Sequence, residues 1–128
     1  MRILLVASAF PLMLCGIAQV QAAAPPHADV VLADFSYSPK TIRLNEGEKV
    51  TLRLINQGSG GHNFSAPEFF QKAQIDPASA PLIRKGKVEV RKGATVDLTL
   101  TPAAGQYKLK CTHFLHSGFG MKGRIVVE

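Results

Sequence analysis

Cysteine is scarce in this chain, whose 128 residues include only Cys15 and Cys111. Cys15 lies in the apolar start of the chain, a segment that we expect to be removed, so Cys111 would have no cysteine partner. Cysteines of exported domains usually form disulfides. The count therefore argues against a disulfide-stabilised domain, and Cys111 needs another explanation. Ligation of a metal as a thiolate is one.

The chain also lacks an apolar run long enough for a membrane-spanning helix. The longest run covers residues 3–18, is interrupted by Pro11, and is shorter than the roughly 20 residues that a span needs. It follows the positively charged Arg2 and precedes small residues of the kind that a signal peptidase reads. These features are typical of a cleaved export signal.

We therefore predict a signal peptide over residues 1–22 and one domain over residues 23–128, with a cut after Ala24 as the alternative. The mature protein would be periplasmic, without stable membrane insertion. Its length suits a single small domain with one core, and the sequence contains no internal repeat that would indicate a second one.

Apolar and polar residues alternate along most of the remaining chain, a pattern that predicts short β-strands. Residues 30–37 are taken as one strand, and the alternation is clearest at residues 50–54 and 107–111. About seven such strands favour an antiparallel two-sheet sandwich. Ser65 and Glu68 have the spacing of a helix-capping box, which predicts one or two helical turns near residues 66–74.

Soft metal ligands are concentrated near the C-terminus, where Cys111, His116 and Met121 stand at C-x4-H-x4-M. Thiolate, imidazole and thioether select copper over magnesium, calcium or manganese. Tyr107 lies four residues before Cys111 in an alternating strand, so the cysteine is expected to point inward. One further imidazole, for which His62 is the candidate, would complete the His2Cys set with a weak axial Met that blue copper centres use.

These residues also have interpretations that do not involve copper. A lone buried cysteine or methionine is usually a core residue, and zinc could occupy four such ligands. Structural zinc sites, however, normally use only Cys and His. The combined spacing of Cys111, His116 and Met121, with Gly-His-Asn upstream, therefore favours copper.

The predicted mature chain resembles the cupredoxins, the small blue-copper family that includes plastocyanin, azurin and pseudoazurin. The resemblance is most specific at Gly-His-Asn-Phe and at Tyr-Lys-Leu-Lys-Cys-x4-His-x4-Met-Lys-Gly. It implies an all-β Greek-key sandwich of about seven to eight strands, and one copper ion cycling between Cu(I) and Cu(II). The implied ligands are His62, Cys111, His116 and Met121, and Asn63 would brace the cysteine loop by hydrogen bonds.

Two features of the ligand loop are left open. His113, two residues after the cysteine, is either an extra copper contact or a solvent-facing loop residue. The apolar side chains around the predicted second histidine either belong to the core or form a docking patch; they are Phe114, Leu115 and Phe119.

The leading functional hypothesis is a monomeric periplasmic electron carrier that exchanges single electrons with redox partner proteins. The partner would be an acidic cytochrome, an oxidase or a reductase. The basic stretch over residues 84–92 would steer such a partner, although a run of this kind is usually just a solvated face. A copper carrier or copper-tolerance protein is the alternative, which His113 and His27 favour as extra ligands.

Other function classes are disfavoured. Multicopper oxidases need many more than the four histidines present, and a binuclear electron-entry site needs a second cysteine in the ligand loop, so we do not expect an enzyme. Nucleic acid is not an expected partner, because the sequence has no groove signature of interleaved basic and aromatic residues.

Overall fold

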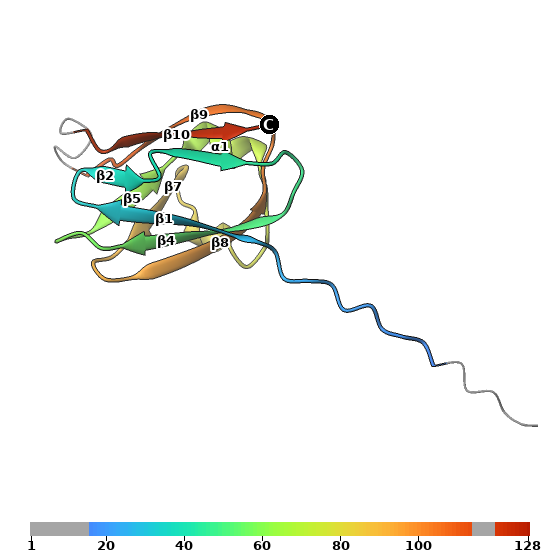
Figure 1. Cartoon of the computed structure of the whole chain (residues 1–128). Helices are drawn as coiled ribbons and strands as arrows, with labels where there is room; N and C mark the ends of the chain where they lie inside the picture. Colours follow the sequence, from blue (N-terminus) through green and yellow to red (C-terminus); the bar gives the residue numbers. More distant parts are fainter. Residues whose placement is uncertain (1–15, 114–119) are drawn as a thin grey trace, which may run out of the picture.

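A computed structural model of the chain describes residues 16–113 and 120–128, which form two five-stranded sheets packed face to face (Figure 1). The first sheet has the order β2 (Ser36–Ser38), β1 (His27–Ala33), β4 (Val50–Asn56), β8 (Thr95–Thr101) and β6 (Gln74–Ile75). The second has the order β3 (Thr41–Leu44), β10 (Lys122–Val127), β9 (Gly105–Lys110), β5 (His62–Ser65) and β7 (Lys87–Val90). The predicted all-β sandwich is confirmed.

The core between the sheets is built by the alternation that the sequence displays. Leu52 of β4 lies opposite Leu98 of β8, and both side chains are fully buried. Phe64, Leu109 and Ile125 bury their side chains from the second sheet. Each such side chain contributes about 1.5–3 kcal/mol by leaving water, so this apolar layer is what holds the two sheets together.

The sheets are mixed, whereas the strand pattern predicted an antiparallel sandwich. β1 runs parallel to β4, and β10 runs parallel to β3. Parallel neighbours need a long crossover connection. Between β1 and β4 the chain supplies one by passing through β3, which belongs to the other sheet.

The stretch that the sequence presented as one strand over residues 30–37 is broken into β1 and β2. Phe35 adopts a positive φ of 64°, and Ala33 pairs with Ser36 across a two-residue turn. Turns of this kind usually carry glycine or asparagine at the left-handed positions, and Asp34-Phe35 carries neither at its second position. The break puts Asp34 at the tip of a hairpin.

The predicted helix is present as α1 (Pro67–Lys72), followed by a 3-10 turn, η1 (Ala80–Leu82). The predicted capping box is not formed, because the N-cap is Ala66 and no side chain caps the helix. Phe69 and Phe70 are buried, and Phe70 packs 5.9 Å from the ring of Phe64. Burial of this aromatic pair, with proline in the first turn, explains the helix.

No helix in the described part of the chain is long and apolar enough to cross a membrane. The predicted signal peptide lies largely outside the described residues and stays a prediction.

Candidate metal centre

The ends of β9 and β10 bring Cys111 and Met121 together. Lys110 pairs with Lys122 in the antiparallel ladder, and one residue further the Cys111 amide donates a hydrogen bond to the Met121 carbonyl at 3.1 Å. Both sulfur-containing side chains are completely buried. As the alternation predicted, Tyr107 and Cys111 are buried and the lysines between them are exposed. The loop that contains the predicted ligand His116 therefore lies between two residues whose backbones are hydrogen-bonded to each other and whose sulfur-containing side chains are buried.

β5 delivers His62 to the interior of the sandwich. His62 and Phe64 share a face of the strand, and the histidine side chain is only 1% exposed. The glycine-rich loop before β5 is needed for this packing, since a Cβ at Gly58 would collide with the His62 ring and with Asp34. Glycine is present here because the backbone approaches a buried ring closely.

Asp34, at the tip of the β1–β2 hairpin, faces the His62 ring. Its Oδ1 lies 3.2 Å from His62 Nε2 and accepts a hydrogen bond from the Ser59 amide at 2.9 Å. Hydrogen bonds from Ser59, and secondarily the contact with His62, hold the pKa of Asp34 below its ordinary value. An ionised carboxylate favours a proton on Nε2, which leaves the lone pair on Nδ1. Metal-binding histidines commonly have such a carboxylate on their outer nitrogen.

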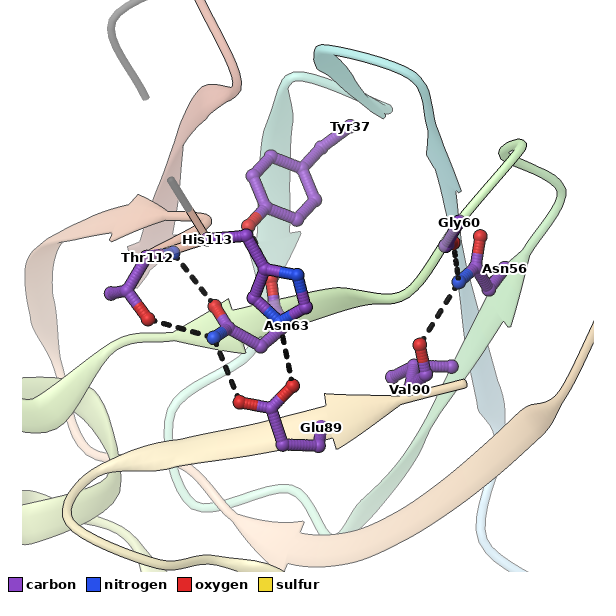
Figure 2. A network of polar contacts seen from close by, with 8 residues as sticks. All are labelled: Tyr37, Asn56, Gly60, Asn63, Glu89, Val90, Thr112 and His113. Atoms are coloured by element: carbon purple, nitrogen blue, oxygen red, sulfur yellow. Dashed lines mark hydrogen bonds and ion pairs between the residues drawn. The ribbon is translucent and has the colours of Figure 1, made fainter. Parts of the chain in front are cut away.

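Asn63 ties β5 to the residue that follows Cys111 (Figure 2). Its amide nitrogen donates to Thr112 Oγ1 at 2.7 Å and to Glu89 Oε1 at 3.0 Å. Its Oδ1 accepts from the Thr112 amide at 2.9 Å, and its backbone carbonyl accepts from the buried Tyr37 hydroxyl at 2.6 Å. These are bonds of the kind that the resemblance implied for Asn63. Its influence on a bound metal stays a prediction.

His113 lies on the outside of the same network (Figure 2). Its Nε2 is 2.8 Å from Glu89 Oε2, its side chain is 33% exposed, and its ring centroid is 6.5 Å from that of His62. Burial raises the pKa of Glu89, but hydrogen bonds from Asn63 and His113 outweigh it and leave the pKa below its ordinary value. The imidazole is thus held by a carboxylate at the surface, and a copper contact by His113 stays a prediction.

Comparison with known proteins agrees with this architecture. Residues 4–127 match the profile of the cupredoxin-like domain family. The chain belongs to this family. No curated protein sequence matches it.

Several solved structures share the cupredoxin fold with the chain at low identity. Auracyanin A, a "blue" copper protein from Chloroflexus aurantiacus, is 22% identical with a TM-score of 0.57, over 82% of this chain and 100% of that one. A reduced auracyanin from Roseiflexus castenholzii is 18% identical with a TM-score of 0.59, over 83% and 99% of the two chains. A multicopper oxidase from Campylobacter jejuni is 11% identical with a TM-score of 0.61, over 84% of this chain but 31% of that one.

The described residues of this cupredoxin fit a copper centre. The donor set comprises a buried cysteine directly after β9, a buried methionine directly before β10 and a buried histidine at the start of β5. Within residues 16–113 and 120–128, no three His, Cys, Asp or Glu side chains form a group that could hold a metal ion. The predicted ligand set has only two such residues there, His62 and Cys111. Its soft character rests on Cys111 and Met121.

Part of the predicted site lies outside the described residues of the cupredoxin. These residues are His116, the predicted second imidazole, and the three apolar side chains Phe114, Leu115 and Phe119. Their predicted roles, as ligand and as docking patch, stay predictions.

Two residues that support the cupredoxin site were not predicted from the sequence. Asp34 had no signal, because it stands in a stretch that resembled a continuous strand. Asn56 donates to the carbonyls of Gly60 and Val90, both at 2.9 Å (Figure 2). Its Oδ1 accepts a hydrogen bond from the Gly58 amide. It thereby shapes the loop before His62. An asparagine at the end of an apolar strand was the only available signal.

Proposed function

We propose that the protein is a periplasmic type 1 copper protein that passes single electrons between partner proteins and has no enzymatic activity of its own. The observation that carries this proposal is the buried Cys111–Met121 pair, closed by a backbone hydrogen bond and joined through Thr112 to the strand of His62. Family membership and the similarity to a blue copper protein agree with it.

The chain's own groups have distinct tasks in this proposal. Cys111 would hold the copper as a strong thiolate donor, and His62 and His116 would supply the imidazoles. Met121 would supply a weak thioether that tunes the potential. Copper held by these four residues would supply a one-electron Cu(I)/Cu(II) couple.

Rigidity of the ligand positions supports rapid exchange of an electron. The amides of Cys111 and Thr112 are both hydrogen-bonded, to Met121 and Asn63 respectively, and the His62 ring contacts Asp34. Because these groups are held by the sheets, the ligands need little movement when the charge at the site changes. Burial also keeps water from the sulfur atoms.

Absorption and EPR spectra of the mature protein after addition of Cu(II) test the proposal, with Cys111→Ser as the matched control. We expect an intense thiolate-to-copper band and a narrow hyperfine splitting, both lost in the variant. A pale spectrum with ordinary hyperfine splitting in the wild-type protein would overturn the type 1 assignment.

A copper carrier is the second candidate, and the surface position of His113 favours it. An imidazole partly exposed and 6.5 Å from the buried His62 ring could assist entry or release of the ion. Competition with a Cu(I) chelator separates the two functions. Exchange within seconds that slows in His113→Ala would favour the carrier, whereas inert copper with fast electron self-exchange would favour the electron shuttle.

A further inference from the structure

The outer face of β9 and β10 carries four positive side chains in a compact array. Lys108 and Lys110 project from β9, and Lys122 and Arg124 project from β10, all exposed. The antiparallel register places Lys110 opposite Lys122 and Lys108 opposite Arg124. We call these four residues the cationic array.

The array does not stabilise the fold. Like charges directly opposite each other on neighbouring strands are destabilising, and here two such pairs are adjacent. Among the described residues, no ion pair involves any of the four side chains, whereas basic residues elsewhere on the surface do have carboxylate partners, as Arg53 does with Asp97. An arrangement that costs stability and lacks internal partners is suited to an external anion.

Hollows lined by basic side chains lie beside the array. A shallow hollow on one side of β10 is lined by Lys40, Lys122 and Arg124, and a second on the other side by Lys108, Lys110 and Lys122. Glu68 of α1 stands at the border, in a neighbouring hollow that also includes Lys108 and Lys110. Positive groups therefore line both flanks of one strand.

The array is continuous with the candidate metal centre. Lys110 directly precedes Cys111, and Lys122 directly follows Met121. In both cases the lysine is exposed while its ligand neighbour is completely buried. A protein bound to the array would thus lie against the two strands that hold the ligand loop. An anionic membrane or a nucleic acid would gain nothing from that proximity, but a redox partner would.

We propose that the cationic array is the docking surface for a carboxylate-rich face of a redox partner protein. This inference rests on the proposed electron-transfer function and assigns the surface that the partner would contact. It differs from the steering segment that the sequence indicated, since residues 84–92 belong to β7 and the turns beside it. β7 is an edge strand of the same sheet, and β5 separates it from β9.

Reversing one charge in each cross-strand pair distinguishes an effect on docking from an effect on folding. In Lys108→Glu/Lys122→Glu, each new glutamate faces a remaining cation across the ladder, so the fold should become no less stable. The matched control is Arg91→Glu/Lys92→Glu, which makes the same change of net charge at two exposed residues of the β7–β8 turn. Both variants should keep the wild-type absorption spectrum.

The probe is a small acidic c-type cytochrome, and the measurement is its second-order rate of electron exchange by stopped flow at several ionic strengths. We expect the array variant to lose roughly tenfold or more of the rate at low salt, with a flattened salt dependence. The control variant should retain at least half of the rate. Equal losses in both variants, or no loss in the array variant, would overturn the inference.

A titration of the copper-free protein with the same cytochrome, followed by amide NMR shifts, makes the test independent of the metal. NMR shifts confined to β9 and β10 would support the docking surface even if the copper protein lacks a type 1 absorption spectrum. A type 1 absorption spectrum without such NMR shifts would reject the docking surface and leave the proposed electron-transfer function in place. Binding to phosphatidylglycerol vesicles without binding to the cytochrome would assign the surface to a membrane and overturn the proposal.

Discussion

Replacing Asn63 with alanine should destabilise the copper-free protein and loosen the ligand loop. The Asn63 side chain is completely buried and makes three hydrogen bonds, two with Thr112 and one with Glu89. Alanine removes all three and leaves the Thr112 amide and the Glu89 carboxylate without this partner. The network connects β5, β7 and the residue after Cys111, so its loss should be felt on both sides of the candidate metal centre.

The magnitude follows from the number and burial of these bonds. A typical hydrogen bond contributes about 0.5–1.5 kcal/mol net, so three give about 3 kcal/mol. That is a substantial part of the 5–15 kcal/mol that small domains possess. At about 4–8 °C per kcal/mol for a domain near 100 residues, the melting temperature should fall by roughly 12–24 °C.

Urea unfolding of the copper-free protein measures the effect, with Asn45→Ala as the matched control. Asn45 makes one exposed hydrogen bond, to Glu48, and its loss should cost less than about 0.5 kcal/mol. Combining Asn63→Ala with Thr112→Val in a double-mutant cycle isolates the bond between the two side chains. A loss below about 1 kcal/mol for Asn63→Ala, or additivity in the cycle, would refute the view that this network holds the loop.

Two further predictions concern the rest of the fold. Gly58→Ala should destabilise the protein by about 1–3 kcal/mol in thermal unfolding and shift the NMR signals of the His62 ring, because the added Cβ collides with that ring. In the control Gly60→Ala the added Cβ has no other atom within 4 Å, so stability should change by less than about 0.5 kcal/mol. Hydrogen bonds from Arg53 hold the pKa of Asp97 below its ordinary value, so this carboxylate stabilises the fold above about pH 4, and the contribution is lost as the pH falls through the folded-state pKa. Asp97→Asn should therefore lower the free energy of unfolding at pH 7, and the stabilities of the variant and the wild type should converge in acid. A difference between the two urea unfolding curves that does not change with pH would contradict this.

Local sequence pattern was sufficient for the parts of the site that depend on one strand. The alternation around Cys111 predicted its inward face because side chains of a strand alternate regardless of which neighbours pair with it. The same reasoning applied to β4, where Val50, Leu52 and Leu54 are buried as expected. The helix was also predicted, although the reason offered for its start was wrong: Ser65 ends β5 and does not cap the helix.

Features that depend on chain reversal or on strand order could not be read in the same way. The turn at Asp34 and Phe35 has no glycine, so the hairpin that presents a carboxylate to His62 resembled the middle of a strand. Parallel pairing of β1 with β4 depends on a crossover through the other sheet, and nothing within either strand specifies it. The carboxylate partner of the histidine was therefore beyond the reach of pattern alone.

The arrangement of surface charge likewise depends on strand pairing, which the local sequence does not specify. Basic residues adjacent in sequence, as at residues 84–92, are conspicuous but distribute over a strand and its turns. Lys108 and Arg124 are sixteen positions apart along the chain and become direct neighbours only because β9 pairs with β10. Chain connectivity alone does not force a cation onto both sides of that pairing, since a glutamate at either position would relieve the repulsion. Four exposed cations lie on the strands next to Cys111 and Met121 although like charges on neighbouring strands are destabilising, and this is the observation on which the proposed docking surface rests.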